Sequence, residues 1–65
     1  MNKYVYQVTC RDFIGAIYFS SWIKAFKYAR DSQGLWNRDY EDNYITIMTN
    51  DKKTIYLEIR KEVIR

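Results

Sequence analysis

The side chains that most often carry out catalysis are scarce in this chain of 65 residues. It contains one cysteine, Cys10, and no histidine. The commonest general base is therefore missing, and a zinc site with the usual cysteine and histidine ligands cannot form. Cys10 lies within an alternating apolar segment, where we expect a small buried side chain rather than a nucleophile.

Carboxylates and glycines do not supply the missing chemistry. Asp39, Glu41 and Asp42 fall within four positions. In a segment rich in turn-forming residues, such a group is typical of a solvated surface rather than of a cation site. Gly15 and Gly34 lie too far apart to form a phosphate-binding loop. We therefore predict a protein without catalytic residues, metal or cofactor, and hence not an enzyme.

Aromatic side chains are present in excess. They make up 18% of the residues, with seven Tyr, three Phe and two Trp, and the net charge is +3. A chain of this length forms one domain, here residues 1–65, and folding buries only about 60% of the surface of the unfolded chain. Rings that so small a core does not need remain available for binding another macromolecule.

The first part of the sequence predicts a β-hairpin. Residues 3–11 are rich in β-branched and aromatic types and alternate as a strand with one buried face does. Turn-forming residues follow at 12–15, and 16–19 can return as a second strand. The face that we expect to be buried carries Tyr4, Tyr6, Val8 and Cys10 in the first strand and Ile17 and Phe19 in the second.

A helix is predicted next. Ser20 and Ser21 are suitable N-caps, so the helix should begin near Trp22. Gly34 is suited to the left-handed conformation that ends many helices, which places the last helical residue at about Gln33. The spacing predicts a buried stripe of Trp22, Ile23, Ala25, Phe26 and Ala29, with Lys24, Lys27, Tyr28 and Asp31 facing away from it.

The remaining sequence predicts an ordered loop and a second hairpin. Residues 34–43 mix turn-forming and aromatic types without a clear period, so we interpret them as a loop. Residues 44–49 and 54–60 each alternate and are joined by a polar turn. We expect Ile45, Ile47, Ile55, Leu57 and Ile59 to face the helix, and Tyr44, Thr46, Met48, Tyr56, Glu58 and Arg60 to face away from it.

These elements together predict an α+β domain of ββαββ order. A four-stranded antiparallel sheet with the helix packed on one face satisfies the pattern. The second face of the sheet then stays uncovered. Residues 61–65 either extend the last strand or fray, and the sequence does not decide between the two.

Two regions are candidates for binding a partner, and the loop, in which Trp36, Arg38 and Tyr40 alternate, is the better of the two. The uncovered sheet face and the loop both carry Tyr, Trp, Met or Arg, the types enriched at interfaces. The alternatives are that solvent-facing strand positions favour Tyr in any case, and that Trp36 packs over the end of the core. The predicted partner-binding residues are Tyr18, Trp36, Arg38, Tyr40, Tyr44, Met48, Tyr56 and Arg60.

We expect the partner to be a protein, or a complex of protein and nucleic acid. An aromatic sheet beside basic residues can also stack single-stranded nucleic acid, so direct nucleic-acid binding is the alternative. The basic residues are spread along the chain, however, and Asp42 and Glu58 lie among the candidates. A third possibility is a homodimer, formed through an exposed edge strand or through the aromatic face.

The sequence carries no signal for a membrane or for export. No apolar run approaches the roughly 18–20 residues of a membrane span, and no signal-peptide pattern follows Met1. The single cysteine excludes an intrachain disulfide. We therefore expect a cytoplasmic protein. Because the chain begins at Met1 and has no linker, we also expect it to be a complete, stand-alone protein.

The stretch IYFSSWIKAFKYARDS, residues 17–32, runs from a strand through a serine cap into a helix. This joint, together with the Lys, Tyr, Ile and Asn bias, the absence of His and Pro and the small size, resembles small accessory proteins of phages and prophages, among them the anti-CRISPR proteins. The resemblance implies a phage-encoded inhibitor that occludes a site on a host protein, such as a CRISPR-Cas component, in the host cytoplasm. It assigns no functional residue, and the positive net charge departs from those inhibitors that mimic DNA.

Overall fold

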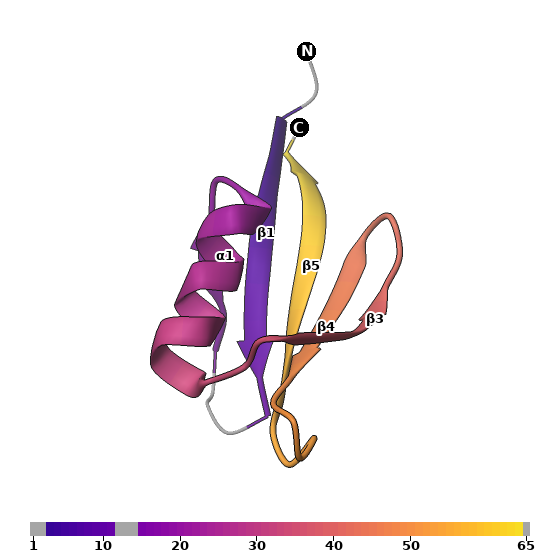
Figure 1. Cartoon of the computed structure of the whole chain (residues 1–65). Coiled ribbons are helices and arrows are strands. Elements are labelled where there is room, and N and C mark those ends of the chain that lie inside the picture. Colours follow the sequence, from indigo (N-terminus) through magenta and orange to yellow (C-terminus); the bar gives the residue numbers. More distant parts are fainter. Residues whose placement is uncertain (1–2, 12–14, 65) are drawn as a thin grey trace.

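In the described chain, two strands precede the helical segment and three strands follow it. The structure is a computed structural model that describes residues 3–11 and 15–64. It is an α+β fold in which one short helix packs on an antiparallel sheet, as the sequence predicts (Figure 1). The elements are β1 (Lys3–Cys10), β2 (Ile17–Phe19), α1 (Trp22–Tyr28), the π-helical turn η1 (Ala29–Gln33), β3 (Asn37–Glu41), β4 (Ile45–Thr49) and β5 (Tyr56–Ile64).

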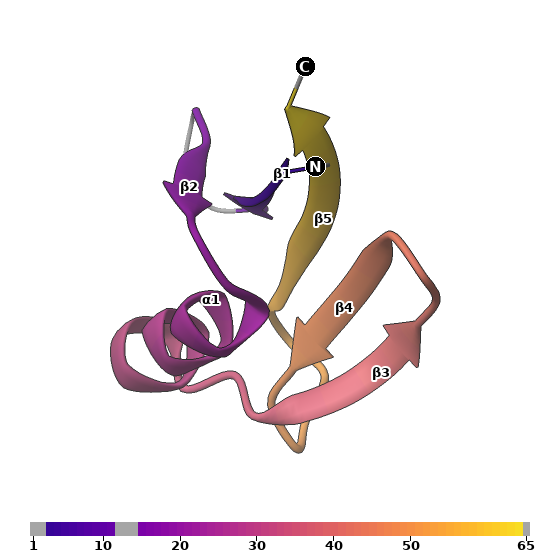
Figure 2. The ribbon, with the colours of Figure 1, turned by 90° about the horizontal axis from the view of Figure 1, so that it is seen from above.

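The sheet has five strands in the order β2-β1-β5-β4-β3, with all neighbours antiparallel. The strands nearest the two ends of the chain, β1 and β5, pair from Lys3 opposite Ile64 to Cys10 opposite Leu57. This central pair joins the two hairpins into one sheet. Figure 2 shows the sheet curving around α1, so the helix lies on the inner face and the outer face is uncovered.

The fifth strand corrects the prediction of a four-stranded sheet. Residues 37–41, which the sequence predicts as a loop, form β3 at the edge beside β4. The Trp36 backbone N–H donates to the Thr49 carbonyl oxygen at 3.1 Å, and the register shifts between Arg38 and Tyr40. This bulge lets a segment that lacks strict alternation pair as a strand, which is why no strand period is visible in the sequence.

The predicted caps form at both ends of the helical segment. The Ser21 hydroxyl oxygen accepts a hydrogen bond from the Lys24 backbone N–H at 3.2 Å. At the other end Gly34 has a φ of 67°, in the left-handed region that favours glycine. The turn predicted over 12–15 lies outside the described residues apart from Gly15, whose φ is 101°.

The buried stripe of the helix differs in two positions from the prediction. It is centred on Ala25 and Ala29, both fully buried. Because successive helical residues turn by about 100°, Ile23 lies almost opposite this centre, and it is 56% exposed. Tyr28 lies closer to the stripe and packs against Phe19, with the ring centres 5.4 Å apart. The predictions that Ile23 is buried and that Tyr28 faces away are therefore wrong.

The core lies between the helix and the inner face of the sheet. The predicted inner faces of β1 and β5 are confirmed at Val8 and Leu57, which are fully buried. Tyr4, near the start of β1, is 36% exposed, so the prediction that it is buried is wrong. Cys10 is buried, as predicted. The buried core residues are Val8, Cys10, Ala25, Ala29, Leu35, Met48, Leu57 and Ile59.

In β4 the buried and exposed faces are the reverse of the prediction. Met48 lies opposite Leu57, and Thr46 lies opposite Ile59. Directly opposed residues in antiparallel strands share a face, so both β4 residues point inward. Because β4 carries apolar side chains on both sides, its own pattern does not determine which face is buried, and pairing with β5 decides it.

Candidate functional site

The outer face of the sheet carries aromatic side chains in rows that cross the strands. The register defines these rows, because directly opposed residues project on the same side. We use the name outer face for a first row of Tyr18, Gln7, Arg60 and Ile45, a second row of Thr9, Glu58, Ile47 and Tyr40, and a third row that includes Tyr56 and Asn37.

Half of the predicted partner-binding residues lie on the outer face. They are Tyr18, Tyr40, Tyr56 and Arg60, and all of them are exposed. The isoleucines of the same rows are half-buried. The outer face thus combines exposed ring area with a partly covered apolar floor, and it draws these side chains from four different strands.

Two of the tyrosine rings have polar or charged neighbours on the outer face. The Gln7 side-chain amide donates to the Tyr18 hydroxyl at 3.3 Å. The Arg11 guanidinium lies 5.5 Å from the centre of the Tyr56 ring, a cation–π contact. Contacts of this kind restrict the rings before a partner arrives, which reduces the conformational entropy lost on binding.

The turn between β3 and β4 is organised by Asp42. One carboxylate oxygen accepts from the backbone N–H groups of Tyr44 and Ile45, each at 2.7 Å, and the other accepts from the Tyr40 hydroxyl at 3.0 Å. The backbone amides, and then the Tyr40 hydroxyl, lower the pKa of the Asp42 carboxyl. The hydrogen bond to Asp42 and its negative charge raise the pKa of Tyr40. The Tyr40 ring is thereby fixed at the edge of the outer face.

The other predicted residues do not join the outer face. Met48 is 0% exposed in the core, so its prediction as an exposed binding residue is wrong. Arg38 and Tyr44 lie on the inner side of the sheet, beside Trp22 and Lys61 respectively. Trp36 precedes β3 and is 50% exposed, while the adjacent Leu35 is the residue that enters the core.

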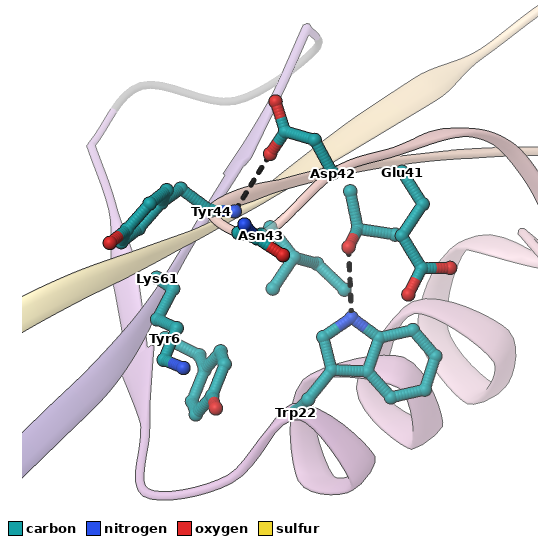
Figure 3. A pocket seen from close by; sticks show the side chains of 9 residues that line it. Tyr6, Trp22, Glu41, Asp42, Asn43, Tyr44 and Lys61 are labelled. Atoms are coloured by element: carbon teal, nitrogen blue, oxygen red, sulfur yellow. Dashed lines mark hydrogen bonds between the residues drawn. The ribbon is translucent and has the colours of Figure 1, made fainter.

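A cleft of about 190 Å³ opens on the inner side of the sheet, beside the start of α1 (Figure 3). The Trp22 indole N–H donates to the Thr46 hydroxyl oxygen at 3.2 Å. The Trp22 ring stacks on Phe26, and the Arg38 guanidinium lies 4.8 Å from its centre. This inner cleft is lined by Tyr6, Trp22, Glu41, Asp42, Asn43, Tyr44, Thr46, Ile59 and Lys61.

Sequence patterns alone do not reveal the inner cleft. Tyr6 and Trp22 are predicted only as core residues, and Lys61 is left in a segment that either extends the strand or frays. The sequence contains one signal for a cleft residue. The alternation of the last strand continues past Arg60, and it places Lys61 on the same side of the sheet as Ile59. The cleft itself requires the β3–β4 turn to approach β1 and β5, which no local pattern shows.

The described residues were also searched for metal-binding clusters and membrane-spanning helices. Among residues 3–11 and 15–64, no group of three or more His, Cys, Asp or Glu side chains is placed to hold a metal ion. None of the helical segments in these residues has the length and the apolar composition of a membrane span.

Comparison with known proteins identifies no relative. No family model matches the chain, and no curated protein or solved structure is significantly similar to it. The resemblance to phage-encoded inhibitors therefore stays a prediction. The function has to be inferred from the outer face and the inner cleft themselves.

Proposed function

We propose that this protein is a non-enzymatic binding module that docks onto a folded protein through the outer face of its sheet. The observation that carries the proposal is that three exposed rings, Tyr18, Tyr40 and Tyr56, lie on one face but come from three strands. None of them packs against the core. Tyrosine provides a large contact area, and its hydroxyl tolerates water before the partner binds.

The charges on and beside the outer face favour a protein over a nucleic acid. Arg60 forms an ion pair with Glu58 at 2.5 Å. At the edge of the sheet Lys53 pairs with Asp39 at 2.8 Å, and this pair raises the pKa of Lys53. Nucleic-acid binding draws its affinity from cations that replace the counterions of phosphates. Cations that already have carboxylate partners are better suited to the polar rim of a protein interface.

Single-stranded nucleic acid is the second candidate, because one contact favours it. The Arg11 guanidinium beside the Tyr56 ring resembles the aromatic and cationic platforms on which bases stack. The exposed lysines of α1, Lys24 and Lys27, lie on the other side of the sheet and cannot add to such a platform. Nucleic-acid binding by this face would therefore rest on few cations and be weak.

The proposed partner is a protein of the host cell. The size, the composition and the joint at residues 17–32 resemble phage-encoded accessory proteins, which supports an inhibitor that acts in the host cytoplasm. Its target would be a defence protein such as a CRISPR-Cas component. Occluding a site on a target requires contact area and no chemistry of its own, which agrees with the type of surface that the outer face offers.

Replacing Tyr18 and Tyr56 together by Ala tests the proposal. We expect partner binding to weaken about thirtyfold or more, since buried tyrosines at interface centres often contribute about 2 kcal/mol. The control is Ile23→Ala with Lys27→Ala, two exposed positions on α1. Binding is measured with the partner obtained by affinity capture, and circular dichroism checks that both variants are folded.

Equal partner binding by the folded outer-face variant and the control would contradict the proposal. A parallel titration with a single-stranded oligonucleotide separates the second candidate. Oligonucleotide binding that is lost in the outer-face variant and falls steeply with added salt would favour nucleic acid instead.

A further inference from the structure

One side of the inner cleft is formed by hydrogen-bond donors. Tyr6 and Lys61 are directly opposed on β1 and β5, and the Lys61 backbone N–H donates to the Tyr44 carbonyl oxygen at 2.6 Å. Asn43 precedes Tyr44 in the same turn. Figure 3 shows the Tyr6, Tyr44 and Lys61 side chains on one side of the cleft, across from Trp22. The Lys61 ammonium and the Tyr6 hydroxyl therefore lie on this side of the cleft, with Asn43 in the turn beside them, whereas the Tyr44 hydroxyl points away from the cleft.

These donors have no acceptors within the described protein. Lys61 is half-buried, and its ammonium nitrogen lies 4.0 Å from the centre of the Tyr4 ring. No carboxylate of residues 3–11 and 15–64 forms an ion pair with it. In that part of the chain, the Tyr6 and Tyr44 hydroxyls and the Asn43 side-chain amide also form no hydrogen bond. A ligand that accepts hydrogen bonds and carries a negative charge would complement this region.

The carboxylates of the cleft, in contrast, are engaged. Glu41 accepts from the Arg38 guanidinium at 3.2 Å. Asp42 accepts from two backbone amides and from the Tyr40 hydroxyl. In Figure 3 the Asp42 carboxylate points out of the cleft, toward the Tyr44 backbone N–H. The cleft therefore offers a ligand mainly donors, and its own negative charges are turned toward other groups.

We propose that the inner cleft binds a carboxylate group, with the Lys61 ammonium as its counterion and the Tyr6 and Asn43 side chains as further donors. The cleft volume of about 190 Å³ accommodates an aspartate or glutamate side chain or a small free acid. The tyrosine rings provide apolar surface for the methylene groups of such a ligand. Because the cleft lies on the opposite side of the sheet from the outer face, this inference does not depend on the proposed function.

Nuclear magnetic resonance titration of the ¹⁵N-labelled protein tests the carboxylate site. The probe is glutamate capped as N-acetyl N-methylamide, and capped glutamine is its neutral control. We expect saturable shifts of the Asn43, Tyr44 and Lys61 amide signals with capped glutamate only. Lys61→Met keeps the aliphatic stem and should bind about tenfold more weakly or worse, as the loss of a charged hydrogen-bond partner predicts. Lys27→Met on α1 should bind as the wild type does.

A second titration with succinate tests whether the natural ligand is a small free acid or a carboxylate side chain of a protein. Tighter binding of succinate than of capped glutamate points to a small free acid, and the reverse order points to a side chain of a protein. Either order supports a carboxylate site. Equal shifts with capped glutamate and capped glutamine, no saturable shift with either acid, or undiminished binding by folded Lys61→Met would overturn the proposal.

Discussion

At the scale of single residues, the side-chain hydroxyls of two buried threonines of β4 differ, because among the described residues the hydroxyl of Thr46 is hydrogen-bonded and that of Thr49 is not. Thr46 is buried and its hydroxyl oxygen accepts from the Trp22 indole N–H. Thr49 is 3% exposed, and its hydroxyl oxygen has no partner among the described residues. A buried hydroxyl without a partner costs about 1–3 kcal/mol. Thr49→Val should therefore raise the unfolding free energy by about 1 kcal/mol and the Tm by roughly 4–8 °C.

Thr46→Val is the matched control for this prediction. It makes the same change in the same strand, but it leaves the Trp22 N–H without an acceptor. We expect it to lower the unfolding free energy by about 1 kcal/mol or more. Thermal unfolding followed by circular dichroism measures both variants. A loss of stability in Thr49→Val as large as that in Thr46→Val would show that the Thr49 hydroxyl has a partner.

The Asp42 carboxylate makes the stability of the β3–β4 turn depend on pH. Hydrogen bonds from the Tyr44 and Ile45 backbone amides lower its pKa from the ordinary value of 3.8. A carboxyl whose pKa is lowered by folding stabilises the fold above its unfolded pKa, and this contribution is lost as the pH falls through the folded pKa. Asp42→Asn should therefore be less stable than the wild type at pH 7, and the difference should shrink below about pH 4.

Urea unfolding of the wild type and Asp42→Asn across this pH range measures the effect. The substitution keeps an oxygen acceptor but removes the charge, so it isolates the ionised form of Asp42. A stability difference that stays constant between pH 7 and the acid limit would mean that ionisation of Asp42 is not coupled to folding.

At the scale of elements, the structure agrees with the sequence where the determinants are local. Ser21 and Gly34 mark the ends of the helical segment, because each acts on backbone groups within one turn of itself. The face of β1 is predictable because apolar residues dominate one side of the strand. For β4 the alternation is equally regular, but both sides are apolar, and only the register with β5 selects the buried side.

The residues of the outer face and of the inner cleft also differ in whether local sequence predicts their position. Tyr18 and Tyr56 reach the outer face by strand parity alone, which the sequence shows. Tyr40 reaches it through pairing of β3 with β4 across a bulge, which no local period indicates. The inner cleft combines Tyr6, the β3–β4 turn and Lys61, segments far apart in the chain. It could not be predicted before the sheet order was known.

Gly34 ends the helical segment in a backbone conformation that favours glycine. Its φ of 67° is costly for a residue with a Cβ atom, but a Cβ added there would meet no atom within 4 Å. Gly34→Ala should therefore lower the unfolding free energy by about 1–2 kcal/mol through backbone strain alone. Gly34→Asn should lower the unfolding free energy by less than Gly34→Ala does, because Asn adopts the left-handed conformation more readily than Ala. Urea unfolding measures both, and equal stability of Gly34→Ala and the wild type would contradict the assignment of a strained cap.

At the scale of the whole molecule, the edges of the sheet are poorly suited to pairing with another strand. The edge strand β2 has three residues. The other edge strand, β3, is interrupted by a bulge and carries the charged pair Arg38 and Glu41. Short, bulged and charged edges discourage strand addition. A homodimer built on an edge strand is therefore disfavoured.

The location of the binding surface can be measured directly at two positions with matched exposure. Tyr18 on the outer face is 58% exposed, and Ile23 on α1 is 56% exposed. The photoreactive residue p-benzoylphenylalanine, placed at one position at a time, reports which surface contacts a partner in the cell. We predict crosslinks to one host protein from position 18 and only background from position 23. Crosslinks from position 23 alone, or crosslinks from position 18 only to a second copy of this chain, would contradict docking of the outer face on a host protein.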